Sequence, residues 1–297
     1  MVGNKNSLAT KIVVHTLLIF FCVLCLVPML LTISISLTDN QELIRAGYQI
    51  IPQKFSIKAY YVIFQEPDTL ITGYKNSIIV TAIGTFFNLL LTALIAYPLS
   101  RRSFHFKGVI SAYIFFTMIF SGGLVPSYVL IVRYLHWKDT LLPLIIPAFA
   151  TPFNIFLLRV LFQDIPDSLI EAAKIDGSSE INTFFRIVLP LSKPAIATVA
   201  LMIILAYWND VFNPILYLDS QKNFTIQMIL QHVADFVTMI KNGGLMDATG
   251  QPIDPSTVPS DGVMFGLMVV SSLPMVFMFT ALQKYFIKGI TAGAIKG

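Results

Sequence analysis

The chain has 297 residues, of which 56% are hydrophobic and only 12% are charged, and its mean hydropathy is +0.75. Soluble globular domains usually carry about 25% charged residues, so this composition excludes an ordinary soluble domain and indicates that lipid surrounds most of the protein. The formal net charge is +4. No basic run interleaved with aromatic residues occurs, so we expect no nucleic-acid partner. In membrane proteins, Lys and Arg instead accumulate on the cytoplasmic side.

Six stretches are apolar enough to cross a bilayer, whose hydrocarbon core requires about 20 residues of helix. The first exceeds the apolar core of a signal peptide and lacks a cleavage site with small residues, so we interpret it as a retained span. It contains Cys22 and Cys25, which have the spacing of a redox pair but lie in an apolar run, where cysteines behave as small hydrophobic residues. The sequence predicts one all-α transmembrane domain over residues 1–297. Its six predicted spans are 12–35, 75–99, 109–132, 140–162, 195–218 and 263–286.

The distribution of charge predicts the orientation of these spans. With the N-terminus in the cytoplasm, the cytoplasmic segments contain 12 Lys and Arg against 5 Asp and Glu, whereas the external segments contain 8 against 10. The tightest basic cluster consists of Arg101, Arg102 and Lys107. Because positive residues resist translocation, both termini are predicted to be cytoplasmic.

The longest predicted external loop covers residues 219–262. Its later part, 242–262, is rich in Gly, Pro, Asp and Ser, which predicts an irregular excursion. Irregular loops longer than about 12–15 residues are usually functional or disordered. We interpret this one as an arm that contacts a partner.

A charged loop, residues 163–194, connects the fourth and fifth predicted spans. Pro166 suits a first helical turn and Asp167 complements the helix dipole, while Gly177 can adopt the left-handed conformation that ends a helix. A second helical stretch follows, and Pro190 is expected to turn the chain back towards the membrane. The pattern predicts two short helices that protrude into the cytoplasm.

The first of these helices has two different faces. Leu169, Ile170 and Ala173 share one face by their spacing. Ala172 and Ala173 offer a low profile for the close approach of a partner, and Glu171 offers one charge. The alternative is an ordinary amphipathic connector that lies on the lipid headgroups.

The spacing within this loop resembles the signature loop of binding-protein-dependent ABC importer permeases. Two further stretches, Trp208–Pro214 and Lys288–Gly297, resemble the sugar branch of that family, in particular the maltose-type second permease and Gram-positive permeases for complex oligosaccharides. In span count and loop placement the resemblance extends over nearly the whole chain. The matching positions of the loop are Glu171, Ala172, Ala173, Gly177, Ile187, Leu189 and Pro190.

This resemblance implies the fold of a type I ABC importer permease in a bacterial cytoplasmic membrane. It implies that the helix 166–177, which includes Asp176, sits in a cleft of a separate ABC ATPase dimer, and that Lys296 and Gly297 reach the same dimer. It further implies a second homologous permease, an extracellular or periplasmic solute-binding protein contacted by residues 242–262, and a sugar or oligosaccharide substrate. ATP and magnesium would bind to the ATPase.

The chain itself carries no recognisable catalytic motif. No phosphate-binding loop of the form G-x-x-x-x-G-K-[ST] occurs, and the sequence contains no catalytic triad, paired carboxylates or histidines at metal-ligand spacing. We therefore expect no enzyme activity, no cofactor and no metal on this chain.

Polar residues inside spans are costly and tend to face a cavity or a partner helix. The fifth span holds the densest group, in which Asn209, Asp210 and Asn213 follow Trp208. Asn209 and Asn213 are four residues apart and would share a helix face. Amides, a carboxylate and aromatic rings suit a hydroxyl-rich ligand, but interhelical hydrogen bonds between two permeases would use the same residues.

The third and fourth spans add further candidates for a substrate path. Three prolines between residues 143 and 152 precede Asn154; they would leave backbone carbonyls free to line a cavity, or they would only kink the helix. Phe115 and Tyr128 could line the same path or face lipid.

Two other classes of membrane protein remain as alternatives. An ion-coupled secondary transporter would require acid–base relays or repeated halves, whereas Asp210 is the one carboxylate well inside a predicted span. A membrane receptor or scaffold would use the loop 163–194 to bind another soluble protein.

Overall fold

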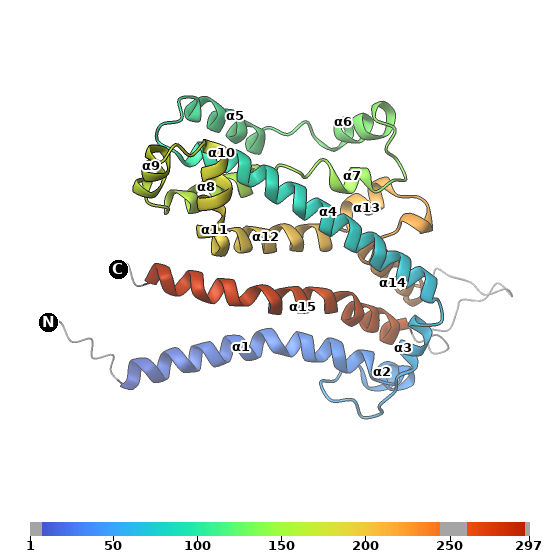
Figure 1. The fold of residues 1–297 in the computed structure, drawn as a ribbon. Coiled ribbons are helices and arrows are strands. Elements are labelled where there is room, and N and C mark those ends of the chain that lie inside the picture. Colours follow the sequence, from blue (N-terminus) through green and yellow to red (C-terminus); the bar gives the residue numbers. More distant parts are fainter. Residues whose placement is uncertain (1–7, 244–259, 295–297) are drawn as a thin grey trace. The chain divides into compact units, whose positions relative to one another are not determined.

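The computed structural model describes residues 8–243 and 260–294 of the chain (Figure 1). In these residues the backbone forms helices and connecting turns, with one isolated antiparallel bridge between Thr38 and Phe55. The predicted all-α class is confirmed. The chain divides into two units. Unit 1 contains the described parts of residues 1–68 and 230–273, and unit 2 contains those of residues 69–229 and 274–297.

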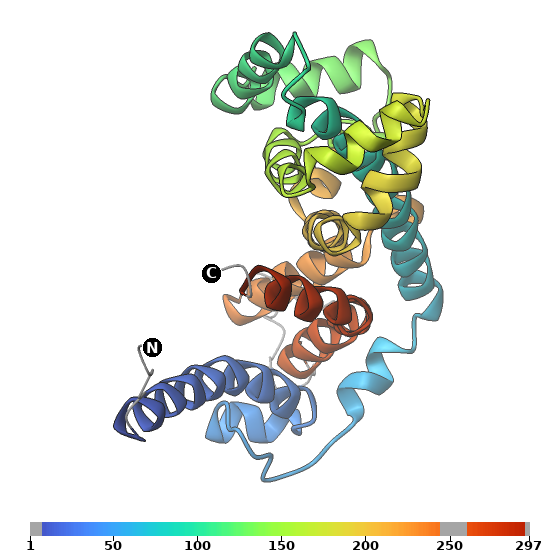
Figure 2. The ribbon, with the colours of Figure 1, turned by 60° about the vertical axis from the view of Figure 1, so that its left-hand side comes forward.

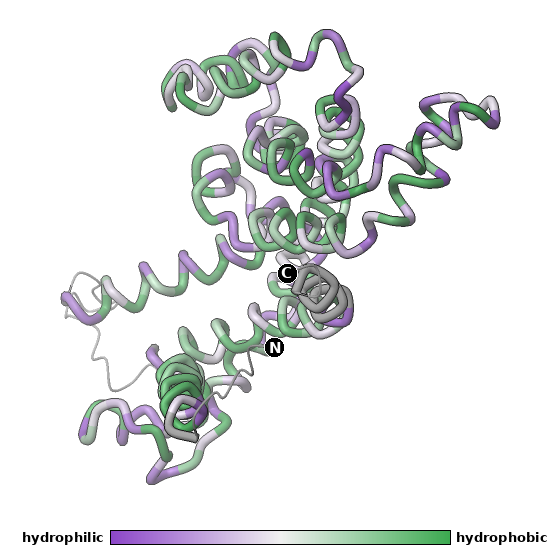
Figure 3. The backbone as a smooth tube through the Cα atoms, turned by 90° about the vertical axis from the view of Figure 1, so that its left-hand side faces the viewer, coloured by the Kyte–Doolittle hydropathy of each residue, from purple (hydrophilic) through white to green (hydrophobic). Residues whose placement is uncertain are grey.

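Unit 1 is built on two long apolar helices. The side chains of α1 from Ile12 to Leu30 are largely exposed, and this helix is strongly hydrophobic along its length (Figure 3). Such a surface requires lipid or another protein to cover it. The helices of unit 1 are α1 (Leu8–Ser36), α2 (Asn40–Ala46), α3 (Lys58–Ile63), most of α14 (Ile226–Lys241) and the first part of α15 (Ser260–Ala294).

Polar contacts join α15 to the other elements of unit 1. Asp261 accepts a hydrogen bond from the Tyr48 hydroxyl at 3.2 Å and pairs with Lys241 at 2.7 Å. Burial opposes the charge on Lys241, but the bond to Asp261 outweighs it and raises the pKa of Lys241 above its ordinary value. A Cβ added at Gly262 would lie 3.2 Å from that of Ala59, so α15 also packs closely against α3.

Unit 2 is organised around α4, whose 34 residues form the longest helix in this unit (Figures 1 and 2). One of its faces buries polar side chains, including Asn76, Asn88 and Thr92, which all have hydrogen-bond partners within unit 2. The helices of unit 2 are α4 (Pro67–Ser100), α5 (Lys107–Ile119), α6 (Leu124–Val129), η1 (Leu130–Tyr134), α7 (Leu142–Ile145), α8 (Pro152–Gln163), α9 (Asp167–Ile175), α10 (Glu180–Thr183), η2 (Phe184–Val188), α11 (Leu189–Leu191), α12 (Lys193–Trp208), α13 (Phe212–Tyr217), η3 (Gln221–Asn223) and the remainder of α14 and α15.

The apolar helices differ in how continuous they are. Among the described residues, three helices are long and apolar enough to cross a membrane alone: Thr10–Ser36, Pro67–Ser100 and Asp261–Lys284. Two bent pairs add to these: Lys107–Ile119 with Leu124–Tyr134, bent by 102°, and Glu180–Leu191 with Lys193–Trp208, bent by 83°. The chain therefore crosses the membrane several times. A total of six spans stays a prediction, because the predicted span 140–162 holds only α7 and the 12-residue α8.

The predicted span 195–218 is not one continuous helix. Helix α12 ends at Trp208, and α13 begins at Phe212. Asp210 lies in the break, where its carboxylate accepts bonds from the backbone N–H of Asn213 at 3.1 Å and from its amide at 2.8 Å. The expectation that Asn209 and Asn213 share a helix face is therefore wrong, because Asn209 follows the end of α12 and Asn213 belongs to α13.

The core of unit 2 lies between α4, α8 and α12. Leu158 and Phe162 of α8 are fully buried, and so are Leu99 of α4 and Val199 of α12. The helices α8 and α12 pack directly against each other. Leucine, valine and phenylalanine meet here without polar atoms, so the contact is held by packing. It holds α8 in place and with it the start of the charged loop that follows.

A glycine allows the close approach of α4 and α12. A Cβ added at Gly84 would overlap the ring of Tyr207. We predict that Gly84→Ala displaces this ring and destabilises the purified protein by about 1–3 kcal/mol, the usual cost of overpacking, which appears as a lower Tm. Gly108→Ala is the control, because a Cβ there meets open space. Equal Tm values for the two variants would contradict the prediction.

Candidate functional site

The charged loop between α8 and α12 contains the two predicted helices. Helix α9 ends at Ile175 with Asp176 as its C-cap, and Gly177 follows with φ +79°, the left-handed conformation that favours glycine. The Gly177 N–H donates to the Lys174 carbonyl at 3.0 Å. The Ser179 hydroxyl then accepts from the Asn182 N–H and caps α10. Local hydrogen bonds thus stabilise the turn at Gly177 between α9 and α10.

The expected turn at Pro190 is wrong by two residues. Pro190 lies in α11, which continues directly from η2 as part of one helical run. The chain instead bends at Ser192, by 83° between the helical run Glu180–Leu191 and α12. The Ser192 N–H still donates to the Val188 carbonyl at 2.9 Å.

The faces of α9 differ from the predicted ones. Ile170 and Ala173 are buried, whereas Leu169 is 44% exposed. Ala173 therefore packs inside the protein and is not available to a partner, because the helix turns it towards the same side as Ile170. Exposed apolar side chains flank the charged residues instead: Ile175 is 86% exposed and Ile181 is 72% exposed.

The remaining motif residues divide between this surface and the interior. Glu171, Ala172, Asp176, Gly177 and Pro190 are exposed. Ile187 and Leu189 are half-buried beside the fully buried Val188. Lys296 and Gly297 lie outside the described residues.

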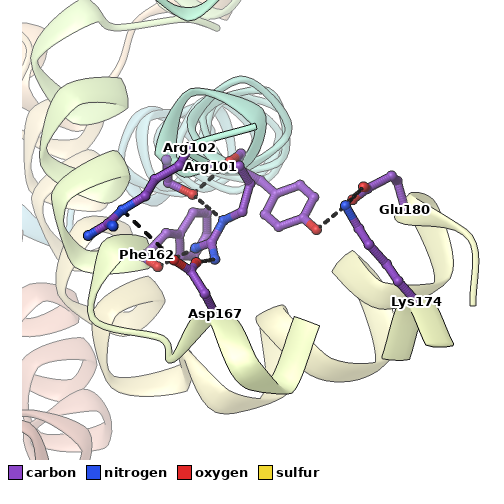
Figure 4. A network of polar contacts seen from close by, with 8 residues as sticks. Arg101, Arg102, Phe162, Asp167, Lys174 and Glu180 are labelled. Atoms are coloured by element: carbon purple, nitrogen blue, oxygen red, sulfur yellow. Dashed lines mark hydrogen bonds and ion pairs between the residues drawn. The ribbon is translucent and has the colours of Figure 1, made fainter. Parts of the chain in front are cut away.

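Arg101 joins the loop to α4 (Figure 4). Only 7% of this residue is exposed. Its Nη2 donates to the Phe162 carbonyl at 2.5 Å, its Nη1 to Asp167 at 3.3 Å, and its Nε to the Ser100 hydroxyl at 2.9 Å. The guanidinium also lies 5.6 Å from the centre of the Tyr97 ring. One buried cation thus holds together the end of α4, the end of α8 and the start of α9.

A second group of contacts fixes the C-terminal end of α9. Glu180 pairs with Lys174 at 2.6 Å and accepts a hydrogen bond from the Tyr97 hydroxyl at 2.9 Å (Figure 4). The hydrogen bond from Lys174 is the main reason that the pKa of Glu180 lies below its ordinary value; burial acts in the opposite direction. Glu180 is therefore ionised at neutral pH and fixes the last turn of α9 to α10 and α4.

Unit 2 also contains a cavity of about 760 Å³. Among the predicted substrate-path residues, Asn154, Asp210 and Asn213 line it. The wall carries amide, hydroxyl and carboxylate groups among apolar side chains. The other residues that line the cavity are Asn88, Ser121, Gly123, Leu124, Ser127, Ile131, Pro143, Leu144, Pro147, Ala148, Thr151, Met202, Ile203, Ala206, Tyr207 and Tyr217.

Side chains of the cavity wall donate hydrogen bonds to backbone carbonyls in the proline-containing segment between residues 143 and 152. The Tyr207 hydroxyl donates to the Ile145 carbonyl at 3.0 Å. The Asn88 amide donates to the Ala148 carbonyl and, at 3.1 Å, to the Thr151 hydroxyl. The interruption between α7 and α8 is therefore stabilised by side chains from α12 and α4, as a break at membrane depth requires.

Four predicted path residues lie elsewhere. Trp208 is buried, with its ring 6.3 Å from that of Tyr74. Asn209 donates to the Leu205 carbonyl at 3.0 Å, and Phe115 is 55% exposed. Tyr128 stacks on Tyr217, a residue of the cavity wall, with 5.9 Å between ring centres.

The sequence analysis did not predict Asn88 as a residue of the substrate path, although its position in a predicted span indicates such a role. Asn88 is an amide in the middle of a predicted span, and such residues usually face a cavity or a partner helix. It is 2% exposed and also accepts a hydrogen bond from Thr92 at 3.0 Å. By contrast, the acceptor of Tyr207 could not be found by spacing, because the bond joins residues 62 positions apart.

The fold and these sites define a multi-pass membrane permease subunit. Residues 88–292 match the family described as "Binding-protein-dependent transport system inner membrane component", and the chain belongs to this family. The resemblance inferred from the charged loop is thereby confirmed. Members of the family are transport subunits and not enzymes, and this assignment removes the secondary-transporter alternative. Among the described residues, no group of three or more His, Cys, Asp or Glu could hold a metal ion.

Several relatives carry the names of sugar and oligosaccharide permeases. The chain is 35% identical to the polygalacturonan/rhamnogalacturonan permease YtcP of Bacillus subtilis, over 99% of this chain and 100% of the relative. It is 36% identical to Protein LplC of Bacillus subtilis, over 92% and 90%. The trehalose/maltose permease MalG of Thermococcus litoralis is 28% identical over 94% of each chain.

A solved structure supports the same fold. The chain matches one chain of a bacterial ABC transporter that imports the acidic polysaccharide alginate, with a TM-score of 0.76 and 26% identity, over 93% of this chain and 96% of that one. By their names, these relatives belong to the sugar branch of the importer permeases, which is the branch that the sequence predicted.

The Tyr207 hydroxyl gives a test of how the cavity wall is held. We predict that Tyr207→Phe leaves the Ile145 carbonyl without this donor and destabilises the purified protein by about 1–3 kcal/mol, measured as a lower Tm. Tyr113→Phe is the matched control, because Tyr113 is 70% exposed on α5. An unchanged Tm for Tyr207→Phe would show that the carbonyl does not depend on the hydroxyl.

Proposed function

We propose that this chain is one permease of an ATP-driven importer for an oligosaccharide. In this proposal the chain crosses a bacterial cytoplasmic membrane six times, with both termini in the cytoplasm. A separate ABC ATPase dimer, which binds ATP and magnesium, docks on the helix 166–177. Its closure moves the spans so that the cavity opens alternately to the two sides.

The surface of the charged loop is the observation that carries the docking proposal. Ile175, Ile181 and Leu169 expose apolar side chains on a segment that the charge distribution predicts to be cytoplasmic. Exposed apolar groups with a polar rim mark protein interaction sites. Glu171 and Asp176 supply charges around them. Lys296 and Gly297 are proposed to reach the same ATPase dimer.

The cavity supports a carbohydrate as the transported molecule. Its volume of about 760 Å³ lies in the range of sites for small organic ligands, which is about 300–1,000 Å³. The side chains of Asn154, Asp210 and Asn213 offer amide donors and a carboxylate acceptor, which suit hydroxyl groups. Tyr217, on which Tyr128 stacks, contributes an aromatic ring to the cavity wall. The names of the relatives favour oligosaccharides within this class.

Two further partners complete the proposed assembly. A second homologous permease would pair with this chain, and its presence would cover apolar side chains such as those along α1. A solute-binding protein would deliver the sugar and contact residues 242–262, of which 244–259 lie outside the described residues. An alginate transporter crystallised with its sugar-bound periplasmic protein shares the fold of this chain at 16% identity and a TM-score of 0.55.

The loop helix provides the test of the proposed function. We predict that Glu171→Lys and Gly177→Val each reduce oligosaccharide uptake into proteoliposomes by about tenfold or more and make ATP hydrolysis independent of the loaded binding protein. Glu171 would lose its charge complementarity, and valine would be strained at φ +79°. Membrane insertion should be unchanged, since both residues lie outside the spans. Wild-type uptake in both variants would refute docking on this helix.

The cavity provides a test of the substrate path. We predict that Asn154→Leu and Asn213→Leu lower the stimulation of ATP hydrolysis by the sugar-loaded binding protein several-fold, because each removes a polar group that lines the cavity. Asn209→Leu is the matched control, since Asn209 bonds to its own helix and does not line the cavity. Equal stimulation in all three variants would count against this cavity as the path.

A further inference from the structure

Helix α4 contacts three parts of unit 2 that lie far apart in the sequence. Its C-terminal end meets the charged loop through Arg101, its middle meets the cavity wall through Asn88, and its N-terminal end meets the segment before α14. At about 1.5 Å per residue, its 34 residues span about 50 Å. This helix is therefore long enough to join both sides of a membrane to the cavity.

The contact at the charged loop is centred on the buried Arg101, and the exposed Arg102 adds a longer ion pair to Asp167 at 3.9 Å. Arg101 donates to the Phe162 carbonyl and to Asp167, which belong to α8 and α9. A guanidinium offers five N–H donors in a rigid fork, whereas an ammonium is a single point charge. Lysine at this position would therefore not satisfy both acceptors and the Ser100 hydroxyl. Tyr97, one turn earlier, adds the bond to Glu180.

The contact in the middle of α4 fixes the cavity wall. Asn88 donates to the Ala148 carbonyl and to Thr151, in the segment between α7 and α8. Four residues earlier in α4, Gly84 lies against the ring of Tyr207. Any shift of α4 along its axis would therefore move both the proline-containing segment and α12, which form two sides of the cavity.

The contact at the other end involves buried amide and hydroxyl groups. The Asn76 amide donates to the carbonyls of Lys222 and Phe224 at 3.0 Å each, and the Ser77 hydroxyl accepts from the Ile226 N–H at 2.9 Å. A Cβ at Gly73 would meet the Ile226 backbone at 3.4 Å. Helix α4 and the start of α14 are thus held in register.

We infer that Arg101 is the positioning residue through which a movement of α9 reaches α4, and that α4 carries this movement to the cavity wall. The inference rests on the proposed function, in which an ATPase docks on α9. The route through α4 is favoured over the covalent route into α12, because the latter passes through an 83° bend at Ser192. Helix α4 continues without such a bend to its partners at the far end.

The test uses the complete transporter, with its second permease, ATPase and binding protein, in proteoliposomes. For Arg101→Gln we expect the ATPase to co-purify and hydrolyse ATP, but sugar uptake per ATP to fall about tenfold. Arg101→Lys should recover only part of this ratio. Lys107→Gln is the matched control: it removes one positive charge from the same basic cluster, and in the described residues no hydrogen bond or ion pair joins Lys107 to α9.

The ratio of uptake to hydrolysis separates positioning from a purely structural role. If Arg101 only stabilised the fold, uptake and hydrolysis would fall together with the amount of assembled complex, and their ratio would match that of Lys107→Gln. That result would overturn the inference. If the wild-type chain bound no ATPase, the proposed function itself would fail instead.

A milder variant covers the case in which Arg101→Gln does not assemble. Tyr97→Phe removes only the hydroxyl that donates to Glu180. A lower uptake per ATP in this variant would support transmission through α4, and a wild-type ratio would overturn it. A double variant, Arg101→Gln with Asp167→Asn, should be no worse than Arg101→Gln alone if the two residues act as a pair.

Discussion

The need to satisfy backbone carbonyls where a predicted span is interrupted governs the arrangement of unit 2. A helix broken by prolines leaves carbonyls without N–H partners, and no water is available in the hydrocarbon to replace them. Here the Ile145 and Ala148 carbonyls receive donors from Tyr207 and Asn88. These bonds fix α4, α12 and the broken segment as one wall. Asn88, Ala148 and Tyr207 also line the polar cavity, so the interrupted segment and its donors form part of the cavity wall.

A related constraint operates at the charged loop. The Phe162 carbonyl lies in the last turn of α8, where it accepts backbone N–H groups from Asp164 and Ile165 and a further bond from the buried Arg101 guanidinium. A buried cation without partners would be strongly unfavourable, so Arg101 needs both this carbonyl and Asp167. The result is a helix, α9, whose inner face is fixed to the protein through Ile170 and Ala173. Its outer side is left for a partner.

The division of α9 into a buried face and an exposed face explains which motif residues are accessible to a partner. A motif read along the sequence treats Ala172 and Ala173 alike, but the helix turns them about 100° apart. Ala173 becomes core and Ala172 stays exposed. Conversely, Ile175 and Ile181 fall outside the motif, yet they are among the most exposed apolar side chains of the loop. Tertiary packing therefore selects the exposed surface of the loop from a wider set of residues than the motif.

The sequence by itself determined the class of the protein, the helical nature of its apolar stretches and the charged loop with its joint at Gly177. Hydropathy, charge and the spacing from Glu171 to Pro190 are local properties, so they can be read from the sequence without knowledge of the fold. Only the tertiary structure decided which polar residues meet. The cavity gathers Asn154, Asp210 and Asn213 but not Asn209, because α12 ends at Trp208 and Asn213 belongs to the separate helix α13. The contacts of Asn88, Tyr207 and Arg101 join residues some 60 positions apart, a distance over which helical periodicity carries no information.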